Sequence, residues 1–470
     1  MERIETDICV IGAGSGGLSV AAGAVQMGAR VVLLEGHKMG GDCLNYGCVP
    51  SKALLAAGHK AHDTAQDAFG TKAQPSDPDF AAAKAHVRAA IAAIEPHDSQ
   101  ERFEGLGVRV IREFGRFVSR TDVEAGPYRI TARRFVVATG SGPLIPEIPG
   151  LEATPYLTNE TIFDLMERPT HLLIIGGGPI GVELAQAHRR LGSEVTVLQS
   201  GRALVRDDPD AAALVLESLR SEGVKIIEGA SVTEVSGTAG AITARTEAGE
   251  SYTGSHLLIA VGRKVNVEGL GLETAGVAFD RRGVKVDAGL RSKTNKRVYA
   301  VGDAAGGLQF THLAGYHAGV VARPLLFGLP AKARTDHVPW VTYSDPELAQ
   351  VGLTEADARK KYGKKLDVAR AEFSGNDRAI ATGQNRGFAK VMVVKGKPVG
   401  ATIVGPQAGE LIQVWALAIA SRLKMSAIAG MVAPYPTLGE INKRAAGAYF
   451  SPKLFDNPWV KRFVGLVQRF

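Results

Sequence analysis

Apolar residues group into short runs separated by glycine-rich turns, and this grouping occurs twice along the chain. An apolar run at 7–11 leads into a glycine loop, and a second run at 31–34 ends at Glu35. Runs at 172–175 and 195–198 repeat the order, which here ends at Gln199. A strand-length run, a glycine loop, a helix-length segment and a second run are typical of a βαβ unit. The pattern therefore predicts two dinucleotide-binding domains.

The rest of the apolar pattern divides the chain further. A run at 297–301 leads into Gly302 and Asp303, and we expect it to rejoin the first sheet. Alternating runs at 389–394 and 399–404 precede an apolar helix expected at 410–424, which indicates an α+β module. The fold class expected is α/β, with two Rossmann-like domains and a C-terminal α+β domain. The Pro-rich stretch 143–149 is read as a linker, and the expected bounds are 1–145 with 270–335, then 146–269, 336–450, and a tail at 451–470.

The first glycine loop has the spacing G-x-G-x-x-G at Gly12, Gly14 and Gly17. The first glycine permits a tight turn, the second lets a pyrophosphate approach the backbone, and the third allows close packing of helix on strand. The N-terminus of the following helix offers N–H groups to an anion. Glu35 ends the second strand, where a carboxylate can accept hydrogen bonds from ribose hydroxyls.

The second loop repeats the spacing at Gly176, Gly178 and Gly181, but Gln199 replaces the acid. A neutral amide does not repel a 2′-phosphate, and Arg202 follows at a distance suited to pairing with one. Gln199 could also bond a free ribose hydroxyl. The sequence slightly favours NADPH and leaves NADH open.

Two cysteines, Cys43 and Cys48, lie five residues apart in a glycine-rich segment. Pro50 suits the first turn of a helix, and a thiol near that turn feels the positive end of the helix dipole, which favours the thiolate. Such a pair can form a reversible disulfide. The alternatives are a structural thiol pair or half of a metal site. Two cysteines cannot complete a tetrahedral zinc shell, so no metal site is expected.

The cysteine segment 40–52 resembles the redox motif of the class I pyridine nucleotide-disulfide oxidoreductases, which include dihydrolipoyl dehydrogenase, glutathione reductase and mercuric reductase. The resemblance continues through segments 138–140, 260–263, 300–303 and 351–355. It implies FAD and NAD(P)H as cofactors and a homodimer built on the C-terminal domain. The implied electron acceptor is a small molecule or a protein-bound lipoyl group.

The resemblance also implies residue roles. Cys48 would lie against the flavin, Cys43 would meet the substrate, and Lys52 and Glu183 would form an ion pair near the reactive nitrogen of the flavin. A cation at that place stabilises negative charge on reduced flavin. The residues expected to bind FAD are Gly12, Gly14, Ser15, Gly16, Gly17, Glu35, Gly41, Lys52, Thr139, Gly140, Gly302 and Asp303. Those expected to bind NAD(P)H are Gly176, Gly178, Ile180, Gly181, Gln199, Arg202 and Gly262.

One position departs from the family pattern. Disulfide-reducing members carry a catalytic His followed by Glu near the C-terminus, whereas this chain has Tyr435 and Glu440. A phenol titrates near pH 10 and is a poor general base at neutral pH. Fast dithiol–disulfide exchange with lipoamide or glutathione is therefore not expected. The leading interpretation is reduction of a small disulfide, of a thiol-bound metal or of a quinone-like acceptor. Dihydrolipoyl dehydrogenase activity and a redox-sensing flavoprotein that docks through its tail remain alternatives.

Composition narrows the class of protein and the cellular compartment expected for it. The chain has 470 residues, a net charge of +7 and three cysteines, which are too few for a secreted disulfide scaffold. It shows no nucleic-acid motif, signal peptide or membrane-spanning run, so a cytoplasmic enzyme is expected. The tail at 457–470 combines apolar and basic residues at helical spacing. It would contact a membrane surface or a partner, or else pack on the protein's own surface or dimer interface.

Overall fold

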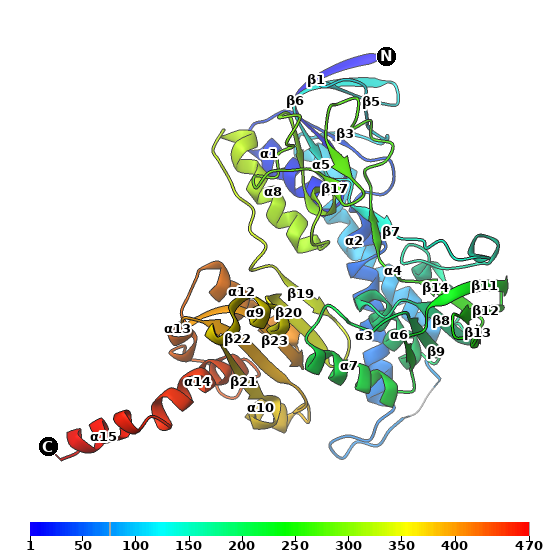
Figure 1. The fold of residues 1–470 in the computed structure, drawn as a ribbon. Helices are drawn as coiled ribbons and strands as arrows, with labels where there is room; N and C mark the ends of the chain where they lie inside the picture. Colours follow the sequence, from blue (N-terminus) through cyan, green and yellow to red (C-terminus); the bar gives the residue numbers. More distant parts are fainter. Residues whose placement is uncertain (75–76, 470) are drawn as a thin grey trace. The chain divides into compact units, whose positions relative to one another are not determined.

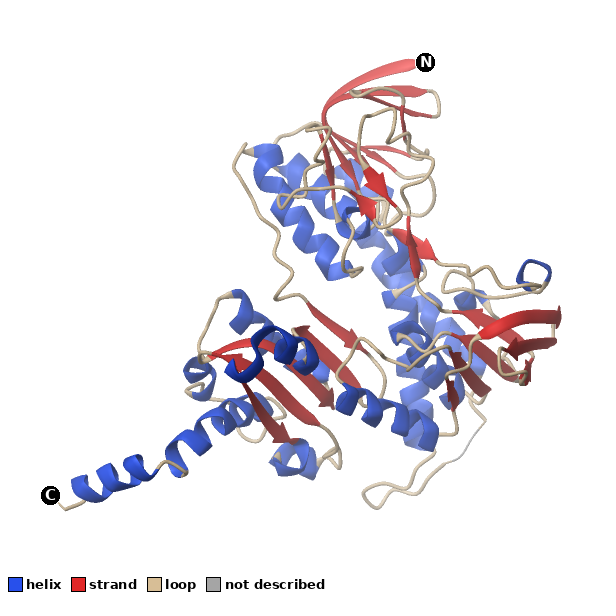
Figure 2. Cartoon of the chain, viewed as in Figure 1, coloured by secondary structure: helices blue, strands red, loops and turns tan. Residues whose placement is uncertain are grey.

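The computed structural model describes residues 1–74 and 77–469, and the chain divides into two compact units. Unit 1 consists of Met1–Gly176, Ala187–Val195 and Val232–Ala333. Unit 2 consists of Gly177–Gln186, Thr196–Ser231 and Arg334–Phe470. Figure 1 follows the elements along the chain, and Figure 2 separates helices from strands.

A largely parallel sheet forms the centre of unit 1. Its strands are β1 (Glu2–Ile11), β2 (Val31–Leu34), β3 (Arg109–Ile111), β4 (Arg116–Phe117), β5 (Asp122–Ala125), β6 (Tyr128–Val137) and β18 (Val298–Ala300). They run in the order β3-β2-β1-β6-β5-β4, and β18 pairs in parallel with β6. The apolar run at 297–301 thus returns to the first sheet, as the sequence predicts.

Both faces of this sheet are covered, which explains why β2 is apolar throughout. Val10 and Leu33 belong to one buried cluster, and Cys9 and Val32 belong to another on the opposite face. Parallel strands buried on both faces have continuous apolar runs for this reason. On one face, α1 (Ser15–Gln26) lies beside α8 (Thr311–Leu326), as Figure 1 shows.

The remaining elements of unit 1 surround this sheet or follow it in the chain. β8 pairs in parallel with β14, β7 pairs with β15, and β11, β12 and β13 form a small antiparallel sheet. The helices are α2 (Gly41–Asn45), α3 (Cys48–Thr64), α4 (Phe80–Asp98), α5 (Gln100–Gly105), η1 (Leu151–Ala153), η2 (Ile162–Asp164) and η3 (Gly302–Ala305). The strands are β7 (Ser141–Pro143), β8 (His171–Ile175), β11 (Val232–Thr238), β12 (Ala241–Thr246), β13 (Ser251–Gly254), β14 (His256–Ile259), β15 (Arg263–Val265), β16 (Phe279–Asp280) and β17 (Gly283–Val284).

Two elements, α6 (Pro179–Arg190) and β9 (Glu194–Gln199), contribute residues to both units. Within unit 2, β9 pairs in parallel with β10 (Lys225–Glu228), so the second glycine loop has the strand partner expected of a βαβ domain. The linker and the domain bounds expected from the sequence stay predictions.

The centre of unit 2 is an antiparallel sheet in the order β19-β20-β23-β22-β21. Its strands are β19 (Pro339–Thr342), β20 (Glu347–Gly352), β21 (Leu366–Glu372), β22 (Phe388–Val394) and β23 (Lys397–Gly405). Its helices are α7 (Pro209–Ser221), α9 (Glu355–Tyr362), η4 (Gly363–Lys365), η5 (Phe373–Gly375), α10 (Asp377–Ala381), α11 (Ala408–Leu411), α12 (Gln413–Ala420), α13 (Met425–Ala429), α14 (Glu440–Phe455) and α15 (Pro458–Val467). Apolar residues of the strands and helices form a common core.

The segment 410–424 does not form the one continuous apolar helix expected from the sequence, so this prediction is wrong. It is interrupted between α11 and α12, where Asn442 Nδ2 donates to the carbonyl oxygen of Leu411 at 3.0 Å and Asn442 Oδ1 accepts from Trp415 Nε1 at 2.7 Å. The side chain of Asn442 thus takes a carbonyl that a continuous helix would use internally. Beyond α12, Arg334 Nη1 donates to the carbonyl oxygen of Ala420 at 2.9 Å, which satisfies the end of the helix.

Candidate active site

The first glycine loop excludes side chains at two positions and leaves space at a third. Gly12 has φ +105°, and a Cβ there would stand 2.5 Å from the carbonyl oxygen of Ala138. A Cβ on Gly17 would stand 1.8 Å from the carbonyl oxygen of Gly12. Over Gly14 the nearest atom to such a Cβ is the Cα of Gly41, at 3.9 Å. The open backbone before α1 fits the pyrophosphate of a dinucleotide.

Glu35 fixes this loop through its carboxylate. Oε2 accepts from the backbone N–H of Ala13 at 2.7 Å, and Oε1 accepts from that of His37 at 2.7 Å. The carbonyl oxygen of Ala13 in turn accepts from the N–H of Gly40 at 3.0 Å. The segment that carries the cysteines is therefore joined, backbone to backbone, to the glycine loop.

The two cysteines lie at consecutive helices. Cys43 is in α2, and Cys48 is the first residue of α3, so its thiol lies at a helix N-terminus. A hydrogen bond links the two side chains, and no disulfide joins them in this structure. Cys48 Sγ also lies 3.3 Å from the hydroxyl oxygen of Thr311, the first residue of α8. Sequence reasoning missed Thr311, which lies 263 residues away in the chain.

These contacts give the two cysteines different pKa values. The hydrogen bond with Cys43 lowers the pKa of Cys48 to about 6 against the opposing effect of burial, and the Thr311 hydroxyl and the Lys52 cation lower it further. The same hydrogen bond, together with burial, raises the pKa of Cys43. At neutral pH Cys48 is therefore a thiolate and Cys43 keeps its proton.

A polar chain links the cysteine segment to the predicted flavin ligand Asp303. Arg263 Nη2 pairs with Asp42 Oδ1 at 3.1 Å, and its Nε donates to Ser141 Oγ at 2.7 Å. Ser141 Oγ donates to Asp303 Oδ2 at 2.5 Å, and Asn159 Nδ2 donates to Asp42 Oδ1 at 3.1 Å. Burial raises the pKa of Asp303, and the Ser141 hydrogen bond opposes this effect. The sequence signalled Arg263 only as part of a family segment, and it gave no sign of this network.

Two further contacts support the predicted flavin residues. Gly302 has φ +59°, and its N–H donates to Nδ1 of His317 at 3.2 Å. Burial lowers the pKa of His317 to about 4, so the ring is neutral and its Nδ1 accepts. Thr139 Oγ1 donates to the carbonyl oxygen of Asn266 at 2.6 Å, and the N–H of Asn266 donates to the carbonyl oxygen of Gly140 at 3.0 Å.

The second glycine loop has a comparable geometry. Gly176 has φ +118°, and a Cβ there would stand 2.4 Å from the carbonyl oxygen of Ala260. Gly178 has no atom within 4 Å of its Cβ position. The amide oxygen of Gln199 accepts from the N–H of Gly177 at 2.7 Å. Ile180 and Gly181 lie in the first turn of α6, Arg202 is exposed, and Gly262 has φ +145°.

Lys52 and Glu183 lie in different units. In unit 1, Lys52 is one turn into α3, and its Nζ donates to Ser51 Oγ at 3.3 Å. In unit 2, Oε1 of the buried Glu183 accepts from the N–H of Tyr343 at 2.9 Å. The ion pair between Lys52 and Glu183 stays a prediction.

Tyr435 is 70% exposed in unit 2, and its hydroxyl donates to Asp377 Oδ2 at 3.0 Å. This hydrogen bond, followed by the charge of Asp377, raises the pKa of Tyr435. Glu440 begins α14, and its Oε2 accepts from the N–H of Thr437 at 3.5 Å. The phenol is therefore held in its protonated form, and less phenolate is present at neutral pH than for a free tyrosine.

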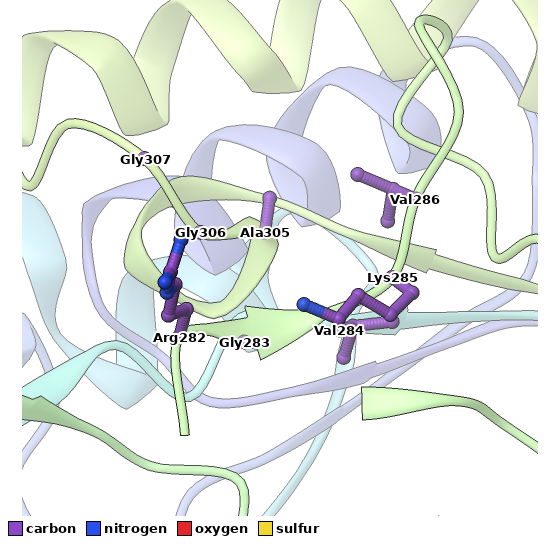
Figure 3. Close-up of a pocket in the computed structure, with 8 residues that line it drawn as sticks. All are labelled: Arg282, Gly283, Val284, Lys285, Val286, Ala305, Gly306 and Gly307. Carbon is purple, nitrogen blue, oxygen red and sulfur yellow. The ribbon is translucent and has the colours of Figure 1, made fainter. Parts of the chain in front are cut away.

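A hollow of about 310 Å³ lies in unit 1 beside η3. Figure 3 shows it between the β17 segment and the turn that follows η3. None of the predicted site residues lines it; the lining residues are Arg282, Gly283, Val284, Lys285, Val286, Ala305, Gly306 and Gly307. Elsewhere in residues 1–74 and 77–469, no cluster of three or more His, Cys, Asp or Glu side chains could hold a metal ion.

The chain combines two glycine loops, each with open backbone suited to a dinucleotide, with a hydrogen-bonded cysteine pair. These features define a redox enzyme that works with two dinucleotide cofactors. Residues 6–318 match the family model described as pyridine nucleotide-disulphide oxidoreductase, and residues 338–446 match its dimerisation domain. The chain belongs to this family. It is an FAD-dependent oxidoreductase that uses NAD(P)H and acts on sulfur groups, and its dimerisation domain supports a homodimer.

Named relatives differ in what they act on. The chain is 34% identical over 458 residues to a mercuric reductase of Acidithiobacillus ferrooxidans, covering 95% of this chain and 83% of that one. It is 35% identical over 457 residues to a dihydrolipoyl dehydrogenase of Bacillus subtilis (strain 168), covering 94% and 96%. Its fold is similar to that of the HOCl-induced flavoprotein disulfide reductase RclA from Escherichia coli, solved as a Cu(II) complex. That similarity has a TM-score of 0.83 and 28% identity, and covers 95% and 99% of the two chains.

Proposed function

We propose that this protein passes electrons from NAD(P)H through FAD to the Cys43–Cys48 pair, and from the pair to a soft metal ion bound by thiolates. One observation carries the choice of acceptor. Cys48 is poised as a thiolate, whereas the tyrosine at the family's His position is protonated and bound to Asp377. In this proposal Cys48 supplies a nucleophilic sulfur, and no histidine occupies the family's catalytic position.

The two glycine loops divide the cofactors in this proposal. The first loop with Glu35 would hold FAD, and the second loop with Gln199 would hold NAD(P)H, with Arg202 favouring NADPH. FAD, when bound, carries the two electrons of the hydride from NAD(P)H to the cysteine pair. Lys52 would supply positive charge beside the flavin and Glu183 would orient it. The network from Asp42 to Asp303 holds the cysteine segment against the flavin site.

The acceptor follows from what each substrate demands. A dithiol such as dihydrolipoamide must lose protons before it attacks a disulfide, and a positioned base supplies on the order of 10²–10⁴-fold of that rate. A soft metal ion needs no base, because thiolates bind it directly. The mercuric reductases among the relatives and the Cu(II) complex of RclA support this acceptor class.

The electrons balance in this scheme. The reduced pair gives up two electrons as the Cys43–Cys48 disulfide forms again. A divalent ion that is reduced to the metal takes both, and two Cu(II) ions that become Cu(I) take one each. NAD(P)H supplies the two electrons and leaves as NAD(P)⁺ with release of one proton. Cys9 is the one cysteine outside the pair, and this low cysteine content suits the reducing cytoplasm, where we expect the enzyme to act.

The experiment compares two reactions of the FAD-loaded dimer, metal-ion reduction and dihydrolipoamide oxidation. Steady-state rates are measured with NADPH and either glutathione-bound Hg(II) or Cu(II) in thiol-free buffer, and separately with NAD⁺ and dihydrolipoamide. The metal ions should be turned over and dihydrolipoamide should be slow. Tyr435→His should raise dihydrolipoamide turnover by roughly 10²-fold, because it restores a base. Tyr435→Phe is the matched control, and it should leave both rates within about threefold because the phenol is not the base.

Two outcomes would contradict the proposal. Brisk dihydrolipoamide turnover by the unaltered protein would make it a dihydrolipoyl dehydrogenase despite Tyr435. Metal reduction that persists in Cys48→Ser would show that the cysteine pair does not pass electrons to the metal.

A further inference from the structure

The last described helix, α15, has an apolar side that nothing in its own unit covers. In Figure 1 it continues from α14 and leads away from the five-stranded sheet of the same unit. No residue of α15 is buried. Five of its large apolar side chains are about half exposed or more: Trp459 75%, Phe463 66%, Val464 49%, Leu466 54% and Val467 50%.

One side of α15 carries apolar side chains, and the other carries basic ones. With about 3.6 residues per turn, Trp459, Phe463 and Leu466 fall on one side of the helix. Val464 and Val467 widen that side. Lys461 and Arg462 fall on the other, Arg469 follows the helix, and residues 457–469 contain no Asp or Glu. The helix is therefore amphipathic with a purely basic polar side.

Local contacts also stabilise α15 without a protein surface beneath it. Asn457 caps its first turn by accepting from the N–H of Trp459 at 3.0 Å, and Pro458 occupies the first helical position. The guanidinium of Arg462 lies 5.3 Å from the centre of the Trp459 ring. Local contacts thus support both the helix and the placement of its largest apolar side chain.

The basic groups of α15 are available to an external anion. Lys453, in the preceding helix, already pairs with Asp367 at 3.1 Å. Within the part of the chain that the structure describes, no carboxylate pairs with Lys461, Arg462 or Arg469. The whole chain carries a net charge of +7, which adds a longer-range attraction to anionic surfaces.

We propose that α15 binds the surface of a lipid bilayer that contains anionic lipids, with its apolar side in the headgroup region. Charge complementarity selects this occupant, because residues 457–469 carry basic side chains and no acid, although the exposed Asp456 precedes them. Leu454 and Phe455, which are 48% and 68% exposed at the end of α14, extend the apolar surface. The match to the dimerisation domain ends at residue 446, before α15 begins. No described helix has the length and apolar character needed to cross a membrane, so the contact would lie along the surface.

The geometry predicts a weak, reversible contact that the homodimer strengthens. One short interfacial helix binds marginally. A dimer that presents both copies of α15 to one surface would gain from their effective concentration. The contact would hold the reductase at a membrane without altering the cysteine site. It is independent of the acceptor proposed above.

Vesicle sedimentation of the full-length, FAD-loaded dimer tests this proposal. Phosphatidylcholine vesicles with and without phosphatidylserine are compared at low and raised salt. The protein should bind only the vesicles with phosphatidylserine and should dissociate as salt rises. Lys461→Glu with Arg462→Glu should lower the bound fraction at least about tenfold, because each basic residue near an anionic surface contributes. Trp459→Ala with Phe463→Ala should lower it comparably at unchanged charge.

The matched control is Lys364→Glu with Lys365→Glu, which makes the same change in net charge at an exposed site of η4. It should bind vesicles nearly as well as the unaltered protein. Oligomeric state and NADPH-dependent turnover are measured for every variant and should not change. Absence of vesicle binding, or binding that the α15 substitutions leave intact, would overturn the proposal. Dissociation of the α15 variants into monomers would also overturn it, by assigning the helix to a second copy of the chain.

Discussion

The two glycine loops are built on the same contacts, and they differ in what those contacts lead to. In both, the side chain that ends the second strand accepts from the N–H of the residue after the first glycine, at 2.7 Å and 22 residues away. In both, a later N–H returns to the carbonyl of that same residue, from Gly40 to Ala13 and from Leu204 to Gly177. The backbone scaffold is thus common to both sites.

The two loops differ in the side-chain group that accepts the hydrogen bond and in the segment whose N–H donates back to the loop. The first loop has a carboxylate, and its return leads directly to the cysteine helices. The second has the amide of Gln199, and its return follows the exposed Arg202. In the proposed function, the first scaffold would place a dinucleotide beside the redox pair, and the second would select between nicotinamide cofactors. This proposed difference in function depends on a few residues after each second strand.

The largest expected effect comes from filling the open space of each loop. Gly14 and Gly178 both have ordinary backbone angles and open space at the Cβ position, so a valine should fold but block the approach of a pyrophosphate. Gly14→Val should purify with at least about tenfold less FAD. Gly178→Val should keep FAD while its KM for NADPH rises by roughly two orders of magnitude. Flavin absorbance per protein and steady-state kinetics measure the two effects, and an exchange of the two phenotypes would reverse our assignment of the loops.

An intermediate effect is expected from charge at the second loop. Gln199→Glu should lower kcat/KM for NADPH roughly 10–100-fold through repulsion of the 2′-phosphate, and Arg202→Ala should lower it about tenfold. kcat/KM for NADH, measured on the same preparations, should change less than about threefold. Equal losses with both cofactors would show that Gln199 and Arg202 do not read the 2′-phosphate.

The smallest effect is expected from making the first loop resemble the second. Glu35→Gln keeps an oxygen for the N–H of Ala13 but loses the acceptor for the N–H of His37. Loss of one such hydrogen bond costs about 0.5–1.5 kcal/mol, so FAD should bind about 3–10-fold more weakly. Flavin fluorescence on titration of the apoprotein measures this. Unchanged affinity would indicate that the carboxylate has no special part in holding FAD.

Local sequence patterns predicted the parts of this enzyme that local physics determines. Glycine spacing and apolar runs located both βαβ units, the return of β18 to the first sheet, and the cysteine segment. The patterns could not reveal Thr311 beside Cys48, or the chain from Asp42 through Arg263 and Ser141 to Asp303, because only the folded chain brings these residues together.

The error over the apolar helix has the same origin. Its sequence is mainly apolar, and the break depends on Asn442, which reaches the carbonyl of Leu411 from another helix. Hydrophobic periodicity carries no information about a polar side chain that arrives from elsewhere in the fold.

Anaerobic reduction of the FAD-loaded protein by NADPH, followed by absorbance across pH, tests the central claim most directly. The first two electrons should rest on the cysteine pair, leaving the flavin oxidised and producing the long-wavelength band of a thiolate against it. Because the pKa of Cys48 is lowered to about 6, the band should be present above that pH and disappear as pH falls through it. It should be absent in Cys48→Ser. A flavin that bleaches with the first equivalent of NADPH, with no such band at any pH, would contradict the account.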